Sequence, residues 1–520
     1  MIFAISSFLI AVVLAWGTMP VLMRFAAHLN LVDLPDDNRK LHETSIPLVG
    51  GIAVFIAVTV SIVATTLIFK SQINIKPGDF SEFIGLFVAS GFLLLVGILD
   101  DAIGLRGKQK LMGQIMAVAL LLIFGFNFDN VRVMGMSIEF GHFSILLVFL
   151  WCLAVTNSIN LMDGADGFAA SIGLTISLAL SVMAMFHPSG RDMDAIAMLA
   201  LTGALLGFLR FNFPPARVFL GDAGSMLIGF LLAAISIRCA FKLGTSYAFF
   251  APFALLAIPF IDTVAALLRR KLTGRSIYAV DRGHIHHMMM KRGLSPVASL
   301  LWLAMLCSMS AIGGTISFFY RRAEFALVSI FLVIVVMLIA GIFGVAELQL
   351  LLKKSKSALG ILFGRDSTGN GSVRQSAVQL QGSEDWKYSW EQLCEFADAH
   401  KLNEITMDLN LPWLHESFYA TRRREDVGKG GPSEWRAEIP LSVNGRLLGR
   451  VEFFGDAKSG VSHHDVVTSL LKLVLDIETL IEEKSDLSDI EKLNGQSASQ
   501  EGFEISEFSG VPVKSDFDSE

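Results

Sequence analysis

Charged residues are scarce in this chain. They make up 17% of its 520 residues, against about 25% in soluble domains, while hydrophobic residues reach 53%. The scarcity is uneven, because long apolar runs dominate up to about residue 350 and an ordinary soluble composition follows. The composition excludes a wholly soluble protein and predicts a membrane domain with a soluble C-terminal part.

Cysteines and N-terminal basic residues are also few. Cys152, Cys239, Cys307 and Cys394 stand far apart, and no CxxC spacing occurs, so neither a disulfide framework nor a zinc ribbon is supported. The first apolar stretch has no basic residue before Arg24 and no clear small-residue cleavage site. We therefore expect a retained membrane span there rather than a secretory signal.

The apolar runs predict an all-α polytopic membrane protein. A helix that crosses about 30 Å of hydrocarbon needs roughly 20 apolar residues, and the chain offers about eleven such stretches. Lys and Arg are concentrated in the loops after the odd-numbered stretches, which places these loops in the cytoplasm and the N-terminus outside. The predicted spans are 2–23, 47–69, 82–99, 111–127, 143–160, 168–186, 195–211, 224–240, 247–268, 296–319 and 323–346.

Polar clusters follow spans one, three, five, seven and nine, and so all fall on the predicted cytoplasmic side. No comparable cluster follows an even-numbered span. This sorting predicts a single cytoplasmic site built from five helix ends. The clusters are VDLPDDNRKLHETSIPLVGG (32–51), LDDAIGLRGKQK (99–110), NSINLMDGADG (157–167), FLGDAGS (219–225) and DRGHIHHMMMKRG (281–293).

These clusters combine groups for a hard metal with groups for anions. Carboxylates at a membrane edge are costly unless they are paired, and carboxylate and amide oxygens are ligands suited to Mg²⁺. Basic residues beside them suit phosphate groups, so the combination indicates phosphoryl transfer. Zinc is disfavoured, because the adjacent His286 and His287 are awkward joint ligands and the flanking basic residues repel a cation.

Each cluster has a plainer interpretation when it is taken alone. The aspartate pair could be solvated or cap a helix, NSINLMDGADG could be a turn, and HIHH could lie on a basic surface loop. Asp222 could be an N-cap, a role compatible with metal binding. Their occurrence together on one side favours a common site.

Other classes of protein remain alternatives. A membrane transporter or binding protein for an anionic nucleotide-sugar or lipid phosphate would also carry buried charges, but transporters place them near the midplane, often within repeated halves. Neither feature occurs here. A CDP-alcohol phosphotransferase would need an arginine shortly after its DGxxA motif, which DGADGFAA lacks, and an intramembrane aspartyl protease would need aspartates inside two spans.

The order and spacing of the motifs resemble the polyprenyl-phosphate N-acetylhexosamine-1-phosphate transferases, also called glycosyltransferase family 4. The resemblance covers about residues 1–350. The HIHH form of the last motif is similar to the bacterial enzymes that begin O-antigen, enterobacterial common antigen or teichoic acid chains. The muramoyl-pentapeptide branch has three consecutive histidines there. The resemblance is carried by Asp33, Pro35, Arg39, Lys40 and His42, then by LDD, NxxNxxDGxDG, GDxGS and DRxHIHH.

The resemblance implies roles for individual residues. It makes Asp222 the main Mg²⁺ ligand and Asn160 the second, with Mn²⁺ as a substitute. It makes Asp100 and Asp101 the catalytic pair beside the lipid phosphate, which Lys110 faces. The remaining residues would bind substrate, with Asn157, Asp163 and Asp166 toward the nucleotide, Arg282, His284, His286 and His287 on the diphosphate, and Arg39, Lys40 and His42 in the first cluster.

The resemblance also implies the reaction. N-acetylhexosamine 1-phosphate, with GlcNAc the expected sugar, would pass from a UDP-sugar to undecaprenyl phosphate, releasing UMP at the inner membrane of a bacterium. Members of the family differ on whether an aspartate first forms a covalent intermediate. We favour direct attack by the lipid phosphate, because a monoester with a second pKa of about 6 is already largely dianionic at neutral pH. The expected partners are these two substrates and the bilayer; a homodimer is compatible with this reading, and no nucleic acid is expected.

The C-terminal part predicts a separate cytoplasmic α+β domain. Residues 351–385 form a predicted linker, 386–484 the domain and 485–520 an acidic disordered tail. Within the domain we expect a helix over 389–400, a strand over 404–411, a hairpin over 434–455 with Asn444-Gly445 at its turn, and a helix over 463–484. Its role stays open between regulation, recruitment of a partner and a passive appendage.

Overall fold

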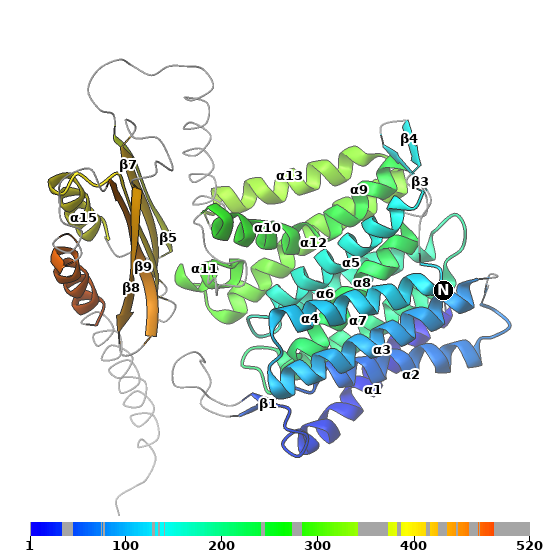
Figure 1. Ribbon diagram of the computed structural model, residues 1–520. Helices are drawn as coiled ribbons and strands as arrows, with labels where there is room; N and C mark the ends of the chain where they lie inside the picture. Colours follow the sequence, from blue (N-terminus) through cyan, green and yellow to red (C-terminus); the bar gives the residue numbers. More distant parts are fainter. Residues whose placement is uncertain are drawn as a thin grey trace, which may run out of the picture. The chain divides into compact units, whose positions relative to one another are not determined.

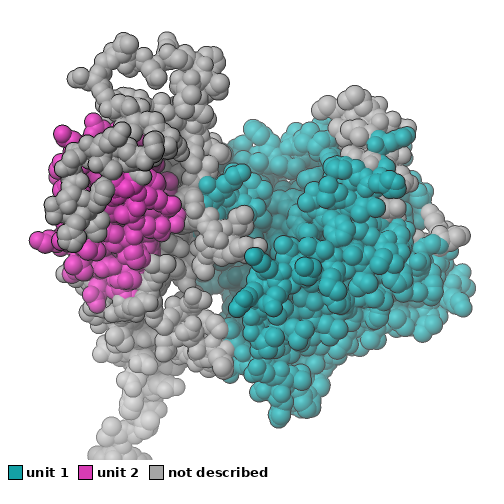
Figure 2. Space-filling model, in the orientation of Figure 1, with its two compact units in different colours: residues 1–347 teal, residues 348–520 magenta. Residues whose placement is uncertain are grey.

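The computed structural model forms two compact units, residues 1–347 and 348–520 (Figure 2). Each unit has its own hydrophobic core. The residues that the structure describes are 2–33, 45–73, 75, 78–126, 130–133, 136–139, 141–240, 245–272, 283–341, 373–381, 386–411, 416–424, 434–443, 446–456, 466 and 468–482.

The first unit is a bundle of apolar helices with two short hairpins (Figure 1). Its helices are α1 (Ile2–Phe25), α2 (Gly50–Ile68), α3 (Asp79–Ile103), α4 (Gly107–Ile123), α5 (Phe143–Met162), α6 (Phe168–Met185), α7 (Asp192–Asn212), α8 (Gly221–Cys239), α9 (Ser246–Leu255), α10 (Ala257–Leu272), α11 (Ile285–Lys291), α12 (Pro296–Tyr320) and α13 (Ala323–Ile339). Its strands are β1 (Val32–Asp33), β2 (Ile46–Pro47), β3 (Asn130–Val133) and β4 (Met136–Glu139).

Eight of the described helices are long and apolar enough to cross a membrane, so the chain is a multi-pass membrane protein. Each of the eleven predicted stretches coincides with helical structure. However, α4 and α13 have only 17 residues each, a rise of about 26 Å. The total of eleven crossings and the orientation therefore stay predictions.

The ninth predicted span is not one continuous helix. α9 and α10 meet at Leu256 with a bend of 75°. Pro259 lies in the first turn of α10 and has no N–H to donate to the carbonyl of Leu255, so one hydrogen bond of a continuous helix is missing at the bend. The prediction of a single helix over 247–268 was wrong for this reason.

α8 is the most enclosed of the span-length helices, with 94% of its apolar window buried. Small residues let neighbouring backbones approach it closely. A Cβ on Gly51 of α2 would lie 2.4 Å from the backbone nitrogen of Gly224, and one on Gly97 of α3 would lie 2.3 Å from Cα of Ala223. The start of α8 is thus fixed by backbone-to-backbone packing against two other helices.

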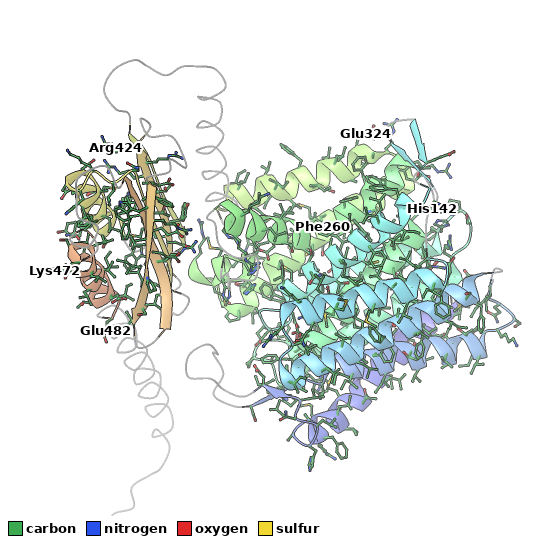
Figure 3. The ribbon with its side chains drawn as sticks, viewed as in Figure 1. His142, Phe260, Glu324, Arg424, Lys472 and Glu482 are labelled. Atoms are coloured by element: carbon green, nitrogen blue, oxygen red, sulfur yellow. The ribbon has the colours of Figure 1, made fainter. Side chains whose placement is uncertain are left out.

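The two ends of the bundle differ in their chemistry. α11 lies at one end, and the β3–β4 hairpin lies at the other (Figure 1). His142, before α5, and Glu324, in the first turn of α13, lie at the β3–β4 end (Figure 3). The last turn of α8 carries Arg238, whose buried guanidinium pairs with Asp194 at 2.5 Å and with Glu82. This ion-pair network belongs to the end opposite to the start of α8.

The second unit is a five-stranded antiparallel sheet covered on one face by helices (Figure 1). Ile405, Met407 and Leu409 alternate with more exposed residues and pack into its core. The strand order is β5-β7-β6-β9-β8, with β5 (Val373–Gln381), β6 (Glu404–Leu411), β7 (Glu416–Arg424), β8 (Glu434–Val443) and β9 (Arg446–Asp456). The helices are α15 (Lys387–Ala399) and the segment 468–482.

Most of the elements predicted for the second unit are confirmed. The strand over 404–411 and the hairpin strands are present, and the described parts of both predicted helices are helical. Asn444 and Gly445, at the predicted turn, lie outside the described residues. The sheet also takes in residues 373–381, which composition assigned to the linker, and β7, which alternation did not single out. Pairing of β5 with β7 along its length explains why a polar Gln- and Ser-containing segment is a strand.

Candidate active site

Asp222 lies in the first turn of α8, at the point where the predicted clusters converge. The chain enters the helix through Gly221, whose φ of 69° is a left-handed conformation that glycine adopts without strain. Backbone N–H groups of Gly50 and Gly51 donate to the carbonyls of Phe219 and Leu220 at 3.0 Å. The loop before Asp222 is therefore bound to the start of α2.

Asp101 holds the N-terminus of α8. Its Oδ1 accepts the N–H of Asp222 at 2.8 Å, and its Oδ2 accepts the N–H of Ala223 at 3.1 Å. These N–H groups have no partner within the helix, and a carboxylate there is also favoured by the helix dipole. A catalytic role for Asp101 stays a prediction, whereas the structure assigns both of its oxygens to positioning Asp222.

Lys110 joins the other aspartates of the site. Its ammonium lies 2.7 Å from Oδ1 of Asp222 and 3.1 Å from Oδ2 of Asp100. The second oxygen of Asp100 accepts the N–H of Leu105 at 2.7 Å, which fixes the turn between α3 and α4. One cation thus lies between two carboxylates that come from α3 and α8.

Asn160 binds directly to Asp222. Its Nδ2 donates to Oδ1 of Asp222 at 2.5 Å and to Oγ of Ser225 at 2.8 Å. The two predicted metal ligands are therefore neighbours, although their helices are far apart in the sequence. Ser225 also belongs to the site. It is the last residue of the GDAGS motif, but no role was predicted for it from the sequence.

Asn157 lies one turn before Asn160 but has different partners. Its amide exchanges two hydrogen bonds with Gln114 of α4, at 2.7 and 3.2 Å, and donates to the carbonyl of Leu153. Gln114 is buried and was not singled out from the sequence, where its position in an apolar helix was the available signal. This pairing places Asn157 between α4 and α5, and its contact with the nucleotide stays a prediction.

The DGADG loop is tied to the segment that precedes α8. Asp166 accepts the N–H of Ala216 at 2.9 Å. Asn212, buried at the end of α7, accepts the N–H of Gly167 at 2.9 Å and donates to the carbonyl of Val218 at 2.8 Å. Asn212 is a second residue that the motifs missed, and it sets the spacing between the two loops.

Asp163, directly after α5, has a carboxyl group with a strongly raised pKa. Desolvation raises its pKa well above 3.8, and the negative charges of Asp222 and Asp101 raise it further. The residue as a whole is half-buried. A raised pKa of this origin is typical of functional acids, although ion-pair networks produce it too.

The histidine cluster adjoins this loop. A Cβ on Gly164 would lie 2.7 Å from Cε1 of His286, which places the buried ring directly against DGADG. Burial lowers the pKa of His286 well below 6.5, and the neighbouring His287 and His284 lower it further. Burial therefore favours the neutral ring of His286, and its contact with a diphosphate stays a prediction.

His284 is held by an aspartate that the sequence motifs do not contain. Its Nδ1 lies 2.6 Å from Oδ2 of Asp262, in α10. The available signal was an ionisable residue within an apolar span, which is by default a functional candidate.

Four predicted residues, Arg39, Lys40, His42 and Arg282, lie outside the described residues.

The donor set around Asp222 fits Mg²⁺. Within the described part of the chain, no three His, Cys, Asp or Glu residues are grouped to hold a metal. Mg²⁺ does not need such a group, since it commonly takes one or two carboxylates together with water and substrate phosphates. Asp222 and Asp100 supply two carboxylates around one ammonium, and Asn160 lies beside them with its NH₂ toward Asp222, so its amide would have to turn over to offer its oxygen to the ion.

Comparisons with known proteins assign this site to a family. The sequence model described as Glycosyl transferase family 4 matches residues 83–240, which contain the clusters around Asp100, Asn160 and Asp222. The probable undecaprenyl-phosphate N-acetylglucosaminyl 1-phosphate transferase of Bacillus subtilis is 32% identical over 58% of this chain and 81% of that protein.

Two further relatives align with similar fractions of this chain. The decaprenyl-phosphate N-acetylglucosaminephosphotransferase of Mycobacterium tuberculosis is 30% identical over 66% of this chain and 88% of its own length. The phospho-N-acetylmuramoyl-pentapeptide-transferase of Oceanobacillus iheyensis is 30% identical over 57% of this chain and 91% of its own.

The fold, the site and these matches define a multi-pass membrane phosphotransferase. Within that class, the chain belongs to the polyprenyl-phosphate N-acetylhexosamine-1-phosphate transferase family. The family predicted from the motifs is thereby confirmed.

Proposed function

We propose that the protein transfers an N-acetylhexosamine 1-phosphate, with GlcNAc as the sugar, from a UDP-sugar to undecaprenyl phosphate and releases UMP. The reaction would take place at the cytoplasmic face of a bacterial inner membrane. It would start a cell-envelope polysaccharide, such as an O-antigen, on its lipid carrier. Membership of the family and the names of two relatives, which specify a polyprenyl phosphate and N-acetylglucosamine, support this proposal.

The ion-paired arrangement of Lys110 with Asp100 and Asp222 is the observation that carries the proposal. An ammonium shared by two carboxylates is neutralised without substrate and can turn toward an incoming phosphate. A lipid phosphate that is largely dianionic at pH 7 is already a nucleophile. It needs a neighbouring cation and a fixed position more than it needs a base.

Asp222 and Asn160 would hold Mg²⁺, or Mn²⁺ in its place, and the ion would supply charge neutralisation at the diphosphate of the donor. Asp101 keeps Asp222 in place by accepting the N–H groups of Asp222 and Ala223 in the first turn of α8. Asp163 and Asp166 lie on the loop that would face the nucleotide, and His286 packs against Gly164 of the same loop.

Replacing Asp222 with Asn tests the metal assignment. We expect sugar-phosphate transfer in membranes to fall by at least about 100-fold, since removal of one well-placed electrostatic group commonly costs this much. Glu324→Gln is the matched control, because Glu324 is an exposed acid at the β3–β4 end of the bundle. Full activity of the Asp222 variant at low Mg²⁺ would contradict the assignment.

The donor is tested by product analysis. Membranes that contain the protein are incubated with undecaprenyl phosphate and each candidate UDP-N-acetylhexosamine, and the lipid product is identified by mass. We expect a diphosphate-linked N-acetylhexosamine and an equal amount of UMP. Tight binding of the UDP-sugar without either product would favour the binding-protein alternative.

A further inference from the structure

The histidine cluster is anchored by a buried carboxylate in the broken span. Asp262 lies in α10 within the apolar segment IPFIDTV, and it is 0% exposed. Its Oδ2 lies 2.6 Å from Nδ1 of His284, and its Oδ1 accepts the N–H of Ile285 at 3.0 Å. We propose that Asp262 is a positioning residue of the active site, which sets the tautomer and orientation of His284 and fixes the first turn of α11.

The hydrogen-bonding capacity of the carboxylate explains how it would do so. An ionised carboxylate only accepts hydrogen bonds, so Nδ1 of His284 carries a hydrogen whether the ring is neutral or protonated. Nε2 is then the ring atom that remains for another partner, and in the protonated ring it donates to an anion. Asp262 thus decides which nitrogen of His284 a phosphate group would meet, an inference that rests on the proposed function.

His284 is linked to the DGADG loop through the ring of His286. The rings of His284 and His286 are nearly parallel, at 3°, with centroids 6.0 Å apart. His286 packs against Gly164, next to Asp163. A shift of His284 would therefore move the ring that packs against the DGADG loop, which a purely structural buried pair elsewhere in the bundle would not do.

His286 gives a second, independent indication that a ligand completes this region. The residue is 2% exposed, and among the described residues neither ring nitrogen has a hydrogen-bond partner. Buried polar atoms are nearly always paired in native proteins. The unpartnered nitrogens of His286, beside His284 and Gly164, are therefore free to accept or donate a hydrogen bond to a group that enters this region.

Asp262→Asn is the decisive variant because it keeps the size of the side chain and one acceptor for the N–H of Ile285. The amide would turn its NH₂ toward His284, so Nδ1 would become an acceptor and the hydrogen would move to Nε2. Nitrogen NMR of the full-length protein with ¹⁵N-histidine reports this tautomer directly. The His284 signals are assigned by their loss in His284→Asn.

The same variant is then assayed for transfer. We expect kcat/KM to fall by about 10- to 100-fold, as it does when the partner that orients a metal-bound histidine is removed from other enzymes. The KM of the UDP-sugar should rise, and the KM of undecaprenyl phosphate should stay unchanged. The double variant Asp262→Asn/His284→Asn should lose no more than His284→Asn alone. Thr263→Val is the matched control, since its buried hydroxyl on the same helix has no hydrogen-bond partner among the described residues.

Stability supplies a readout if Asp262→Asn does not fold. In His284→Asn the new amide can still donate to Asp262, whereas His284→Leu leaves a buried carboxylate with an unpaired oxygen. We expect a lower Tm for the leucine variant than for the asparagine variant.

Three results would overturn the proposal: an unchanged His284 tautomer in Asp262→Asn, additive losses in the double variant, or equal Tm values for the two His284 variants. If the wild-type protein transfers no N-acetylhexosamine 1-phosphate from any UDP-sugar, the proposed function fails. The NMR and Tm measurements would still decide whether Asp262 positions His284.

Discussion

Asp101→Asn tests whether the aspartate acts through the start of α8. The wild-type carboxylate accepts two backbone N–H groups, at 2.8 and 3.1 Å, and faces the positive end of the helix dipole. Asparagine keeps one acceptor, removes the charge and turns an NH₂ toward the second N–H. Loss of one hydrogen bond to a charged group, at about 1.5–3 kcal/mol, and of the dipole interaction, at about 0.3–1 kcal/mol, predicts a destabilisation of roughly 2–4 kcal/mol.

The free energy of unfolding is measured by denaturant titration in detergent, alongside sugar-phosphate transfer. We expect transfer to fall by about 100-fold, because a displacement of about 1 Å at a catalytic group costs that much and Asp222 depends on this contact. The matched control is Ser295→Ala, which removes the N-cap hydrogen bond of α12, at 3.2 Å. It should lose about 1 kcal/mol of stability but keep its activity.

The reasoning is refuted if Asp101→Asn is as stable as the wild type. An inactive but fully stable variant would mean that Asp101 takes part in the reaction itself. In that case, the two hydrogen bonds to α8 would be incidental to its role.

Three further predictions concern pH, packing and charge. The pKa of Asp163 is raised above 3.8 in the folded protein, so its contribution to stability is present at pH values below 3.8 and is lost as pH rises through the higher folded pKa. Asp163→Asn should therefore melt at a higher temperature than the wild type at pH 8 and at a similar one at pH 3.5, and an unchanged difference across this range would argue against the raised pKa. Gly97→Ala should lower stability by about 1–3 kcal/mol through overpacking, because its Cβ would lie 2.3 Å from the backbone of α8, whereas Gly17→Ala, with no atom within 4 Å, should be neutral in the same thermal melt. Lys110→Met should lower kcat/KM for undecaprenyl phosphate by about 100-fold, since a preorganised cation is lost; retention of half the wild-type value would exclude a role for Lys110 beside the lipid phosphate.

The helices and the converging segments could be predicted because they depend on local patterns. Every predicted span coincides with helical structure, since an apolar run of this length has few other ways to satisfy its backbone in a membrane. Asp100, Asn160 and Asp222 were predicted to lie close together, because their clusters were all expected on the same side of the membrane. In the structure, Lys110 and Asn160 both contact Asp222, and Lys110 also contacts Asp100.

The partners of each side chain could not be predicted in this way. Gln114, Asn212 and Asp262 sit singly in apolar helices, and nothing in their local sequence says which polar atom they meet. The broken ninth span was also missed, because the effect of Pro259 depends on whether the helix bends or is merely weakened there.

The sequence by itself determined the membrane unit, the family and the residue types of the site, because hydropathy and motif spacing are properties of the linear chain. Only the tertiary structure decided how those residues are used. It paired Lys110 with two carboxylates, assigned Asp101 to the start of α8 and anchored His284 on Asp262. The physical reason is that hydrogen bonds and ion pairs depend on distances of about 3 Å between atoms on different helices. Such distances are fixed by packing across the bundle, as where Gly51 and Gly97 meet α8, and not by position along the chain.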